Sequence, residues 1–321
     1  MEKSISVLFV GLGSIGTRHL NNLTELCAAK GIGLRADALR STAFRPLRPG
    51  VAEKITHSFH SLLDPAALPH YDMAFITNPT NLHAAALQTV KGRADALFIE
   101  KPILDAGQTR TDLAQLLAPG QKAYVAAPMR WCGTMKALKA YLAAHPDARP
   151  YSVRVICSSY LPDWRPGVDY RTVYSARRAM GGGVTIDLIH EWDYLVDLFG
   201  RPQEVYNFKG TYSELEIDSD DLSVYIARWP RLLAEVHLDY FGRTYRRSIE
   251  LFTRDGTITA DFGAGTLTLA DGTVQHYEED VNERYRREMA YFLEYAAGGS
   301  GESVNTPAQA LDVLRLTLGE E

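Results

Sequence analysis

Short apolar runs alternate with longer stretches of helical spacing from Ser4 to about Ala127. Five apolar runs end near residues 10, 39, 77, 100 and 127. Helical spacing lies between them at 14–30, 81–91 and 106–118. This alternation is typical of strand–helix units on a parallel sheet. Because the runs at 7–10 and 73–76 are apolar throughout, we expect helices on both faces of that sheet.

The pattern changes after Pro128. A helical stretch at 134–144 precedes β-branched and aromatic runs separated by turn sequences, at 151–159, 204–212, 221–229, 232–241, 246–253, 256–261 and 265–270. These runs predict a meandering, mostly antiparallel sheet. Further helices are predicted at 183–199, 282–297 and 307–318. The change of pattern predicts two domains, at 1–128 and 129–321.

Length, net charge and cysteine content exclude several classes of protein. At 321 residues the chain exceeds the roughly 250 residues that one core usually serves, which also favours two domains. The net charge of −5 without a block of basic residues argues against a nucleic-acid partner. The three cysteines, Cys27, Cys132 and Cys157, lack metal-ligand spacing, so we expect neither zinc nor disulfides. With no signal peptide and no apolar run approaching 18 residues, the sequence predicts a cytoplasmic protein without a membrane partner.

A glycine motif follows the first apolar run and opens a helical stretch. Gly11 would permit the tight turn, Gly13 would let a pyrophosphate approach the backbone, and Gly16 would let the helix pack on the strand. Ser14 and Ile15 would start the helix, whose N–H groups bind phosphate. We therefore expect an α/β chain, with a doubly wound Rossmann domain first and a second, α+β domain carrying a large open-faced sheet.

The residues at the end of the second apolar run indicate whether the cofactor is NADP or NAD. Many NAD-binding folds place a carboxylate there, whereas this chain has Arg40, Ser41 and Thr42. A guanidinium with neighbouring hydroxyls suits a 2′-phosphate, so the sequence favours NADP over NAD. The alternative is that Asp37 binds the ribose diol and Arg40 only faces solvent.

Glu100, Lys101 and Pro102 stand at the end of the fourth apolar run. In a parallel sheet this is the edge where ligands bind. A lysine held there can donate to a substrate oxygen, and the proline stiffens the turn that aims it. Taken alone, the same three residues also fit an exposed turn.

Several motifs in one order resemble the Gfo/Idh/MocA family of NAD(P)-dependent oxidoreductases. They are GLGSIG, TNPTNLH at 77–83, EKP at 100–102, an Arg-aromatic stretch with Arg130 and the run GGGVTIDLIHEWD at 181–193. The long sheet after residue 200 and the chain length are similar too. The resemblance implies a dehydrogenase with a Rossmann domain and a substrate domain.

The resemblance also implies roles for particular residues. Lys101 would contact both nicotinamide ribose and substrate, and His190 would accept the proton, with Asp187 beside it in the catalytic helix. Residues expected along the cofactor are Thr77, Asn78, Pro79, His83, Glu100 and Arg130. One departure is that only Leu188 and Ile189 separate Asp187 from His190, whereas the family commonly has three residues with a glycine among them.

The residues around His190 support an acid–base role independently. Asp187, Glu191 and Asp193 surround it in sequence, and such carboxylates would favour its protonated form and fix its tautomer. The alternative is a histidine that only satisfies a helix end or a core hydrogen bond. Metal binding has little support, because hydride transfer to nicotinamide needs no metal.

The segment before that helix is rich in aromatic rings and guanidinium groups. We expect substrate contacts from Tyr160, Trp164, Arg165, Tyr170 and Arg171, together with Asp187 and His190. Aromatic faces pack on sugar rings and arginines pair with carboxylates or phosphates, which suggests an anionic sugar or nucleotide sugar. A subunit-contact arm has a similar composition and is the alternative.

The sequence therefore predicts hydride transfer between NAD(P) and a CH–OH carbon of a sugar, sugar acid or nucleotide sugar. One alternative is a cofactor-binding regulator or scaffold without catalysis. Another is a lyase or glycosidase that uses nicotinamide only transiently. We also expect a homodimer or homotetramer through the C-terminal sheet, whose open face would otherwise expose apolar side chains.

Overall fold

The computed structural model describes residues 4–41, 46–60, 68–298 and 301–320. The chain divides into two compact units. Residues 1–126 and 285–312 form the first unit, and residues 127–284 and 313–321 form the second. This division differs from the predicted domains at 285–312, a stretch that sequence analysis placed in the second domain. Its Met289, Phe292 and Leu293 pack into the core of the first unit.

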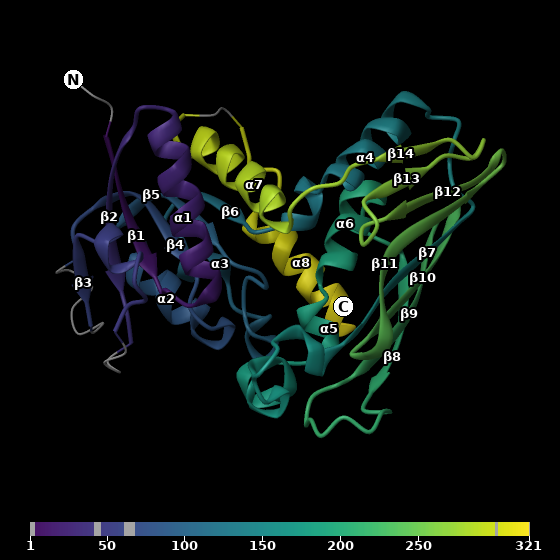
Figure 1. Ribbon diagram of the computed structural model, residues 1–321, viewed down its shortest axis with the longest axis horizontal. Helices are drawn as coiled ribbons and strands as arrows, with labels where there is room; N and C mark the ends of the chain where they lie inside the picture. The colour runs from purple at the N-terminus through teal and green to yellow at the C-terminus, as the bar shows by residue number, and fades with distance from the viewer. Residues whose placement is uncertain (1–3, 42–45, 61–67, 299–300, 321) are drawn as a thin grey trace. The chain divides into compact units, whose positions relative to one another are not determined.

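The first unit contains a six-stranded sheet in the order β3-β2-β1-β4-β5-β6 (Figure 1). Its neighbouring strands are parallel. The strands are β1 (Ser4–Val10), β2 (Gly33–Leu39), β3 (His57–Phe59), β4 (Tyr71–Ile76), β5 (Ala94–Ile99) and β6 (Lys122–Val125). This order confirms the predicted Rossmann sheet. Strand β3 was not predicted, because it is short and has little apolar character.

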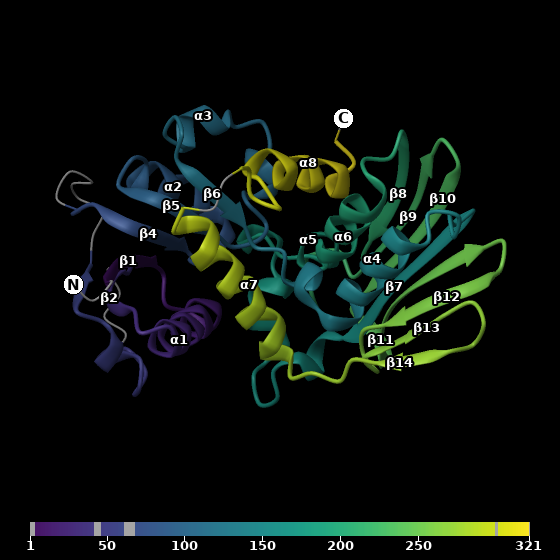
Figure 2. The same ribbon diagram turned by 90° about the horizontal axis from the view of Figure 1, so that it is seen from above.

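Helices cover both faces of this sheet, as Figure 2 shows. Helices α1 (Ser14–Ala29) and α7 (Val281–Ala296) lie on one face, and α2 (His83–Val90) and α3 (Leu113–Leu116) lie on the other. Residues 106–118 do not form the single helix that was predicted. Asp105 accepts from Gly107 N and Asp112 accepts from Ala114 N, so each aspartate caps its own short turn.

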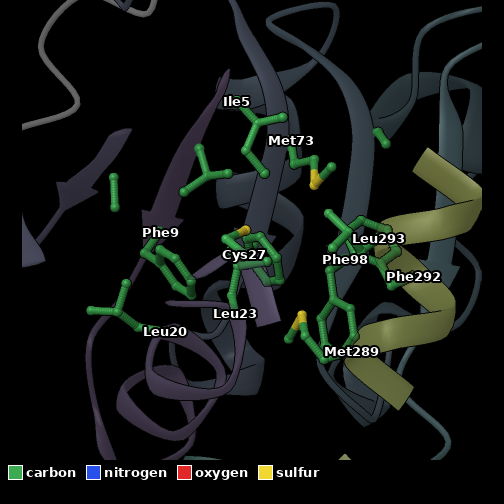
Figure 3. Close-up of a cluster of buried hydrophobic side chains, with 14 of the residues drawn as sticks. Ile5, Phe9, Leu20, Leu23, Cys27, Met73, Phe98, Met289, Phe292 and Leu293 are labelled. Carbon is green, nitrogen blue, oxygen red and sulfur yellow. The ribbon is translucent and has the colours of Figure 1, made fainter. Parts of the chain in front are cut away.

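Aromatic rings fill the core of the first unit (Figure 3). Phe9 stacks on Phe75 with ring centroids 4.5 Å apart, and Phe75 lies 5.4 Å from Phe98. Phe292 of α7 meets both Phe75 and Phe98 edge-on, at 5.5 Å and 5.2 Å. Helix α7 is therefore part of this core, although it lies more than 150 residues beyond the last strand of the sheet.

The second unit contains an eight-stranded sheet in the order β14-β13-β12-β11-β7-β10-β9-β8. Strands β7 and β10 are parallel and the other neighbours are antiparallel. The strands are β7 (Ser152–Tyr160), β8 (Glu204–Gly210), β9 (Leu222–Trp229), β10 (Leu232–Asp239), β11 (Phe241–Thr253), β12 (Gly256–Asp261), β13 (Thr266–Thr268) and β14 (Val274–His276). The predicted mostly antiparallel sheet is confirmed. Strand β14 was not predicted.

Helices cover one face of this second sheet (Figure 2). They are α4 (Gly133–Ala144), α5 (Val184–Asp187) and α6 (His190–Phe199), while α8 (Pro307–Leu318) belongs to this unit from Val313 onward. The predicted helix 183–199 is broken between α5 and α6. There Ile189 N donates to Ile186 O and Glu191 N donates to Leu188 O, so three-residue bonds replace the α-helical pattern.

Within the described residues, no helix is long and apolar enough to cross a membrane. All three cysteines are buried free thiols. Cys27 belongs to the core of the first unit, and Cys157 faces the covered side of the second sheet beside Val155. Burial raises the pKa of the Cys27 thiol, so this side chain acts as an apolar core residue.

Candidate functional site

The glycine turn has the geometry of a dinucleotide site. Gly11 has a φ of +91°, and a Cβ there would lie 2.8 Å from the backbone of Asn78. A Cβ on Gly16 would lie 2.6 Å from Gly11 O and 2.7 Å from Thr77 Oγ1. A Cβ on Gly13, by contrast, would meet no atom within 4 Å. Gly11 and Gly16 are thus required by packing, whereas Gly13 leaves room for a ligand.

The N-terminus of α1 is open to an anion. Gly13 caps this helix without a side-chain hydrogen bond, and the first turn holds no acidic residue. Gly13 and Ser14 are exposed, Ile15 is half-buried, and the helix is 16 residues long. Backbone N–H groups at such an end bind phosphate. The buried Asn78 Oδ1, which finds no hydrogen-bond partner among the described residues, adds an unsatisfied acceptor on the loop that touches Gly11. These residues fit a dinucleotide.

The end of β2 lies beside this turn, because Gly11 N donates to Leu39 O at 2.9 Å. The next residue, Arg40, is half-buried, and Ser41 is exposed; the predicted Thr42 lies outside the described residues. Asp37 does not fit the alternative role of ribose ligand. Its carboxylate is 1% exposed and accepts hydrogen bonds from Tyr71 OH at 2.9 Å and from His57 N at 3.2 Å.

The predicted cofactor loop after β4 is fixed by hydrogen bonds. Thr77 Oγ1 donates to Gly11 O at 2.6 Å. The buried His83 has one ring nitrogen 3.0 Å from Asn78 O and the other 3.2 Å from Ile103 O. Burial lowers the pKa of His83, although the backbone carbonyls around it oppose that shift. His83 therefore holds the Asn78 loop to the turn after Lys101, while Pro79 is exposed.

A buried hydrogen bond between His19 and Glu100 helps to anchor the backbone of Lys101. His19 Nε2 lies 2.6 Å from Glu100 Oε1, and Glu100 Oε2 accepts from Lys101 N at 3.1 Å. Burial by itself would raise the pKa of Glu100, but His19 and the Lys101 charge leave it below the usual range. The Lys101–Pro102 peptide bond is cis. Glu100 thus anchors this turn, and its contact with cofactor stays a prediction.

His19 was not among the predicted site residues. This residue is 0% exposed on α1 and its ring lies 4.7 Å from that of Phe98. Since Nδ1 has no partner in the structure, the ring hydrogen belongs on Nε2, where it points to Glu100. His19 lies on the same buried side of α1 as Leu20, Leu23 and Cys27. This helical spacing was a signal from which a buried histidine could have been predicted.

In the second unit, Asp187 is the centre of a buried polar cluster. Its carboxylate accepts from the hydroxyls of Tyr174, Ser175 and Tyr240, with Ser175 Oγ at 2.6 Å and Tyr240 OH at 2.9 Å. Burial and the adjacent carboxylate raise the pKa of both tyrosines well above the usual range. Both phenols therefore stay protonated and donate. We call Asp187, Tyr174, Ser175 and Tyr240 the Asp187 cluster.

The glycine run before α5 serves packing in that cluster. A Cβ on Gly182 would lie 2.0 Å from Tyr174 O, and one on Gly183 would lie 2.4 Å from Asp220 Oδ1. Asp220 Oδ2 accepts from Thr185 N at 2.9 Å. The first turn of α5 is thus capped by a side chain of the same unit and is not an open anion site.

His190 is the first residue of α6 and is half-buried. The carboxylates expected around it have other partners. Glu191 is fully buried and forms a two-bond ion pair with Arg247, at 2.7 Å and 3.1 Å. Asp187 accepts three hydroxyls, and Asp193 pairs with Arg130. These contacts give the three carboxylates a part in fixing the surrounding helix, and their effect on His190 stays a prediction.

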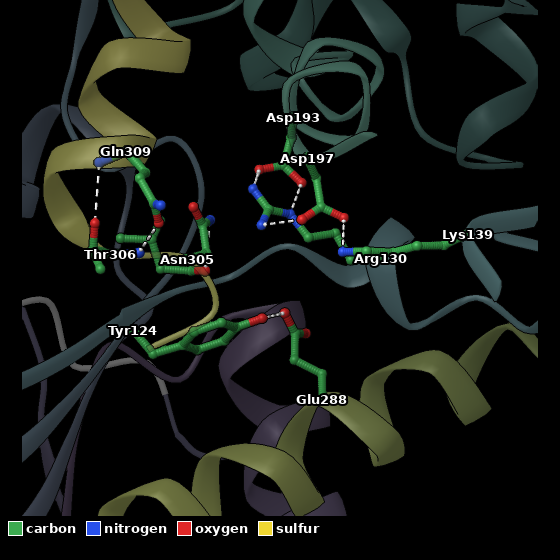
Figure 4. A network of polar contacts seen from close by, with 10 residues as sticks. Tyr124, Arg130, Lys139, Asp193, Asp197, Glu288, Asn305, Thr306 and Gln309 are labelled. Carbon is green, nitrogen blue, oxygen red and sulfur yellow. Dashed lines mark hydrogen bonds and ion pairs between the residues drawn. The ribbon is translucent and has the colours of Figure 1, made fainter. Parts of the chain in front are cut away.

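Arg130 was predicted to bind cofactor, and the structure places its guanidinium among carboxylates of α6 (Figure 4). Nε and Nη2 donate to the two oxygens of Asp193 at 2.8 Å and 2.7 Å. Nη1 donates to Asp197 at 3.2 Å, and Lys139 donates to the other oxygen of Asp197 at 2.6 Å. A guanidinium occupied in this way holds α6 in place, which favours a positioning role.

The predicted substrate segment divides into two groups. Trp164 Nε1 donates to Ser159 Oγ at 3.0 Å, and its ring meets that of Tyr240 edge-on at 5.2 Å. Arg165 lies over the ring of Tyr174, with 6.0 Å from Cζ to the ring centroid. These two residues therefore adjoin the Asp187 cluster.

The other three predicted substrate residues have contacts elsewhere. Tyr160 lies 3.6 Å below the guanidinium of Arg243. Tyr170 OH accepts from Glu216 N at 3.2 Å. Arg171 donates to Asp169 and to Glu216, at 2.9 Å and 2.8 Å. Sequence analysis did not assign Ser175 or Tyr240 to the site, because neither belongs to a motif and both join Asp187 only through the fold.

No group of three or more histidine, cysteine, aspartate or glutamate side chains in the described ranges is arranged to hold a metal ion.

Known proteins resemble this chain along its length. Residues 5–126 match the GFO_IDH_MocA family, described as an oxidoreductase family with an NAD-binding Rossmann fold. The uncharacterized oxidoreductase YrbE of Bacillus subtilis is 23% identical over 337 aligned residues, which cover 98% of this chain and 92% of YrbE.

Solved structures share the fold. A crystal structure of an oxidoreductase from Agrobacterium radiobacter in complex with NAD+, L-tartaric acid and magnesium has a TM-score of 0.79 at 16% identity, covering 98% of this chain and 95% of that chain. The WlbA dehydrogenase from Bordetella pertussis in complex with NADH and UDP-GlcNAcA has a TM-score of 0.76 at 19% identity, covering 98% and 95%.

Proposed function

We propose that this chain, which belongs to the Gfo/Idh/MocA family of NAD-binding Rossmann oxidoreductases, is an NAD(P)-dependent dehydrogenase or reductase of a sugar, sugar acid or nucleotide sugar. The observation that carries the proposal is the glycine turn, where Gly11 and Gly16 are fixed by contacts and Gly13 faces open space. The nucleotide-sugar complex of WlbA supports this substrate class.

The bound nicotinamide would supply the hydride acceptor at C4. Residues of the glycine turn, with Ser14 and the half-buried Arg40, would hold the dinucleotide, and Lys101 would polarise the substrate oxygen. His190 would take the hydroxyl proton, and these two roles reverse in reduction. Asp187 and Arg130 would position the helices that carry this chemistry.

Nicotinamide absorbance distinguishes this function from the two alternatives. With substrate, a dehydrogenase changes the absorbance at about 340 nm in proportion to product. A lyase or glycosidase that uses nicotinamide transiently yields product without net change, and an inactive regulator yields no product. The substrate for this assay can be chosen by thermal shift, because a ligand that binds the folded protein raises Tm.

Arg40 gives a prediction for cofactor choice. We expect kcat/KM to be about 10-fold or more higher with NADP(H) than with NAD(H), since a guanidinium adds charge-assisted bonds to the 2′-phosphate. Arg40→Gln should remove most of this preference and leave NAD(H) kinetics near those of the wild type. Equal efficiency of the wild-type protein with both cofactors would rule out this role.

The open face of the second sheet supports the proposed homo-oligomer. Tyr206 and Phe208 of β8 are 63% and 73% exposed, and Ile226 of β9, which pairs with Tyr206, is 38% exposed. Rings so exposed on one face mark association surfaces. We expect Phe208→Asp to shift the protein toward monomer in analytical ultracentrifugation, with Tyr245→Asp, at an exposed position on β11, as control. An unchanged mass for Phe208→Asp would exclude this edge of the sheet from the interface.

A further inference from the structure

Trp164 and Arg165 are consecutive residues that contact opposite sides of the Asp187 cluster. Trp164 meets the ring of Tyr240, and Arg165 lies over the ring of Tyr174. The hydroxyls of both tyrosines donate to the one carboxylate of Asp187. Four contacts thus link five side chains, from Trp164 through Tyr240, Asp187 and Tyr174 to Arg165. The buried carboxylate fixes both tyrosines, and each tyrosine supports one residue of the pair.

Trp164 is held in place although it is partly exposed. Its side chain is fixed by the hydrogen bond to Ser159 and by the edge contact with Tyr240, yet 38% of the residue remains accessible. A fixed and partly exposed indole is a surface on which a sugar ring can pack at small cost in side-chain entropy.

The cations of this segment differ in their partners. Arg171 donates to both Asp169 and Glu216, and Arg177 lies 3.6 Å from Asp218. Arg165 is exposed, and its guanidinium lies over the ring of Tyr174 without an ion pair to any carboxylate of the described ranges. Its charge is therefore not compensated by a carboxylate, whereas those of Arg171 and Arg177 are.

We propose that Trp164 and Arg165 form a subsite for a sugar that carries an anionic group, either a carboxylate or a phosphate. The sugar ring would pack on Trp164, and the guanidinium of Arg165 would pair with the anion in a two-bond arrangement. This inference rests on the proposed function, since it names the substrate class of that site. It also selects Arg165 over Arg171, which sequence composition alone does not separate.

The test compares binding of neutral and anionic partners by the protein loaded with NADP+. Glucuronate, glucose 6-phosphate and UDP-glucose are each titrated beside glucose, with Kd from calorimetry. We expect at least one anionic ligand to bind about 10-fold or more tightly than glucose. Arg165→Gln should abolish that preference without changing glucose binding, and Arg171→Gln, at equal change in net charge, should keep it.

Two outcomes would overturn the subsite. One is equal affinity for glucose and all three anionic ligands, and the other is a preference that survives in Arg165→Gln. Tm of each variant is measured alongside, and Arg165→Lys, which retains the charge, should keep part of the preference if Arg165→Gln folds poorly. These titrations measure binding at equilibrium, so their result does not depend on whether the protein turns over substrate. Absence of net nicotinamide reduction would count against the proposed function and leave the anion preference measurable.

Discussion

Lys101→Ala lowers kcat by about 10²-fold or more and leaves the Kd for NADP(H) within about twofold of the wild-type value. The loss follows from removing the donor that would stabilise charge on the substrate oxygen in the transition state. Phosphate affinity depends on the glycine turn and should persist. Steady-state kinetics and a titration of cofactor fluorescence give the two quantities separately.

Lys91→Ala is the matched control for this prediction. Lys91 is a half-buried lysine after α2 whose ammonium donates to the backbone carbonyl of Ala114, so its loss should leave kcat near the wild-type value. Lys101→Ala should also keep Tm close to that of the wild type, because Glu100, bound to His19, holds residue 101 through its backbone N–H, which alanine retains. Wild-type turnover by Lys101→Ala would remove the lysine from the mechanism.

Most of the first sheet could be predicted from sequence, because strands such as β1, β4 and β5 are largely apolar runs and the first turn is marked by glycines. Residues 106–118 show where such reasoning stops. Their apolar spacing fits one helix, but Asp105 and Asp112 each bind a backbone N–H two residues ahead. Local side-chain bonds of this kind compete with helix formation.

The partners of charged residues were the least predictable part of the site. Asp187, Glu191 and Asp193 follow one another in sequence, and this suggested a common effect on His190. In the fold, each of these carboxylates meets a residue that lies far from it in sequence. Arg247 reaches Glu191 from β11, and Tyr240 reaches Asp187 from the end of β10.

The same long-range pairing gives two predicted cofactor residues partners that their motifs did not indicate. Arg130 and Glu100 were assigned to the cofactor because of their motifs, yet Arg130 binds two aspartates of α6 and Glu100 binds His19. Motifs report which residues a family retains, and the fold decides whether a residue touches a ligand or holds one that does. Support of this kind is commonly needed to keep an active site rigid.

His190→Ala is the second substitution for which we expect a loss of about 10²-fold or more in kcat, with cofactor affinity nearly intact. The imidazole would accept the hydroxyl proton as hydride leaves the carbon, and a methyl side chain cannot do so. The reason to choose this residue lies in the arrangement of its neighbours. Asp187, Glu191 and Asp193 are all bound to other side chains, so none is available as the base.

The pH profile provides a readout that a merely structural role would not change. In the oxidation direction, kcat should fall at acidic pH in the wild type as the base becomes protonated, and this limb should be absent from the residual activity of His190→Ala. His145→Ala is the control, because His145 is an exposed histidine that stacks on Tyr141 at the end of α4, and its loss should keep both kcat and the profile. An acidic limb that persists in His190→Ala would assign the proton transfer to another group.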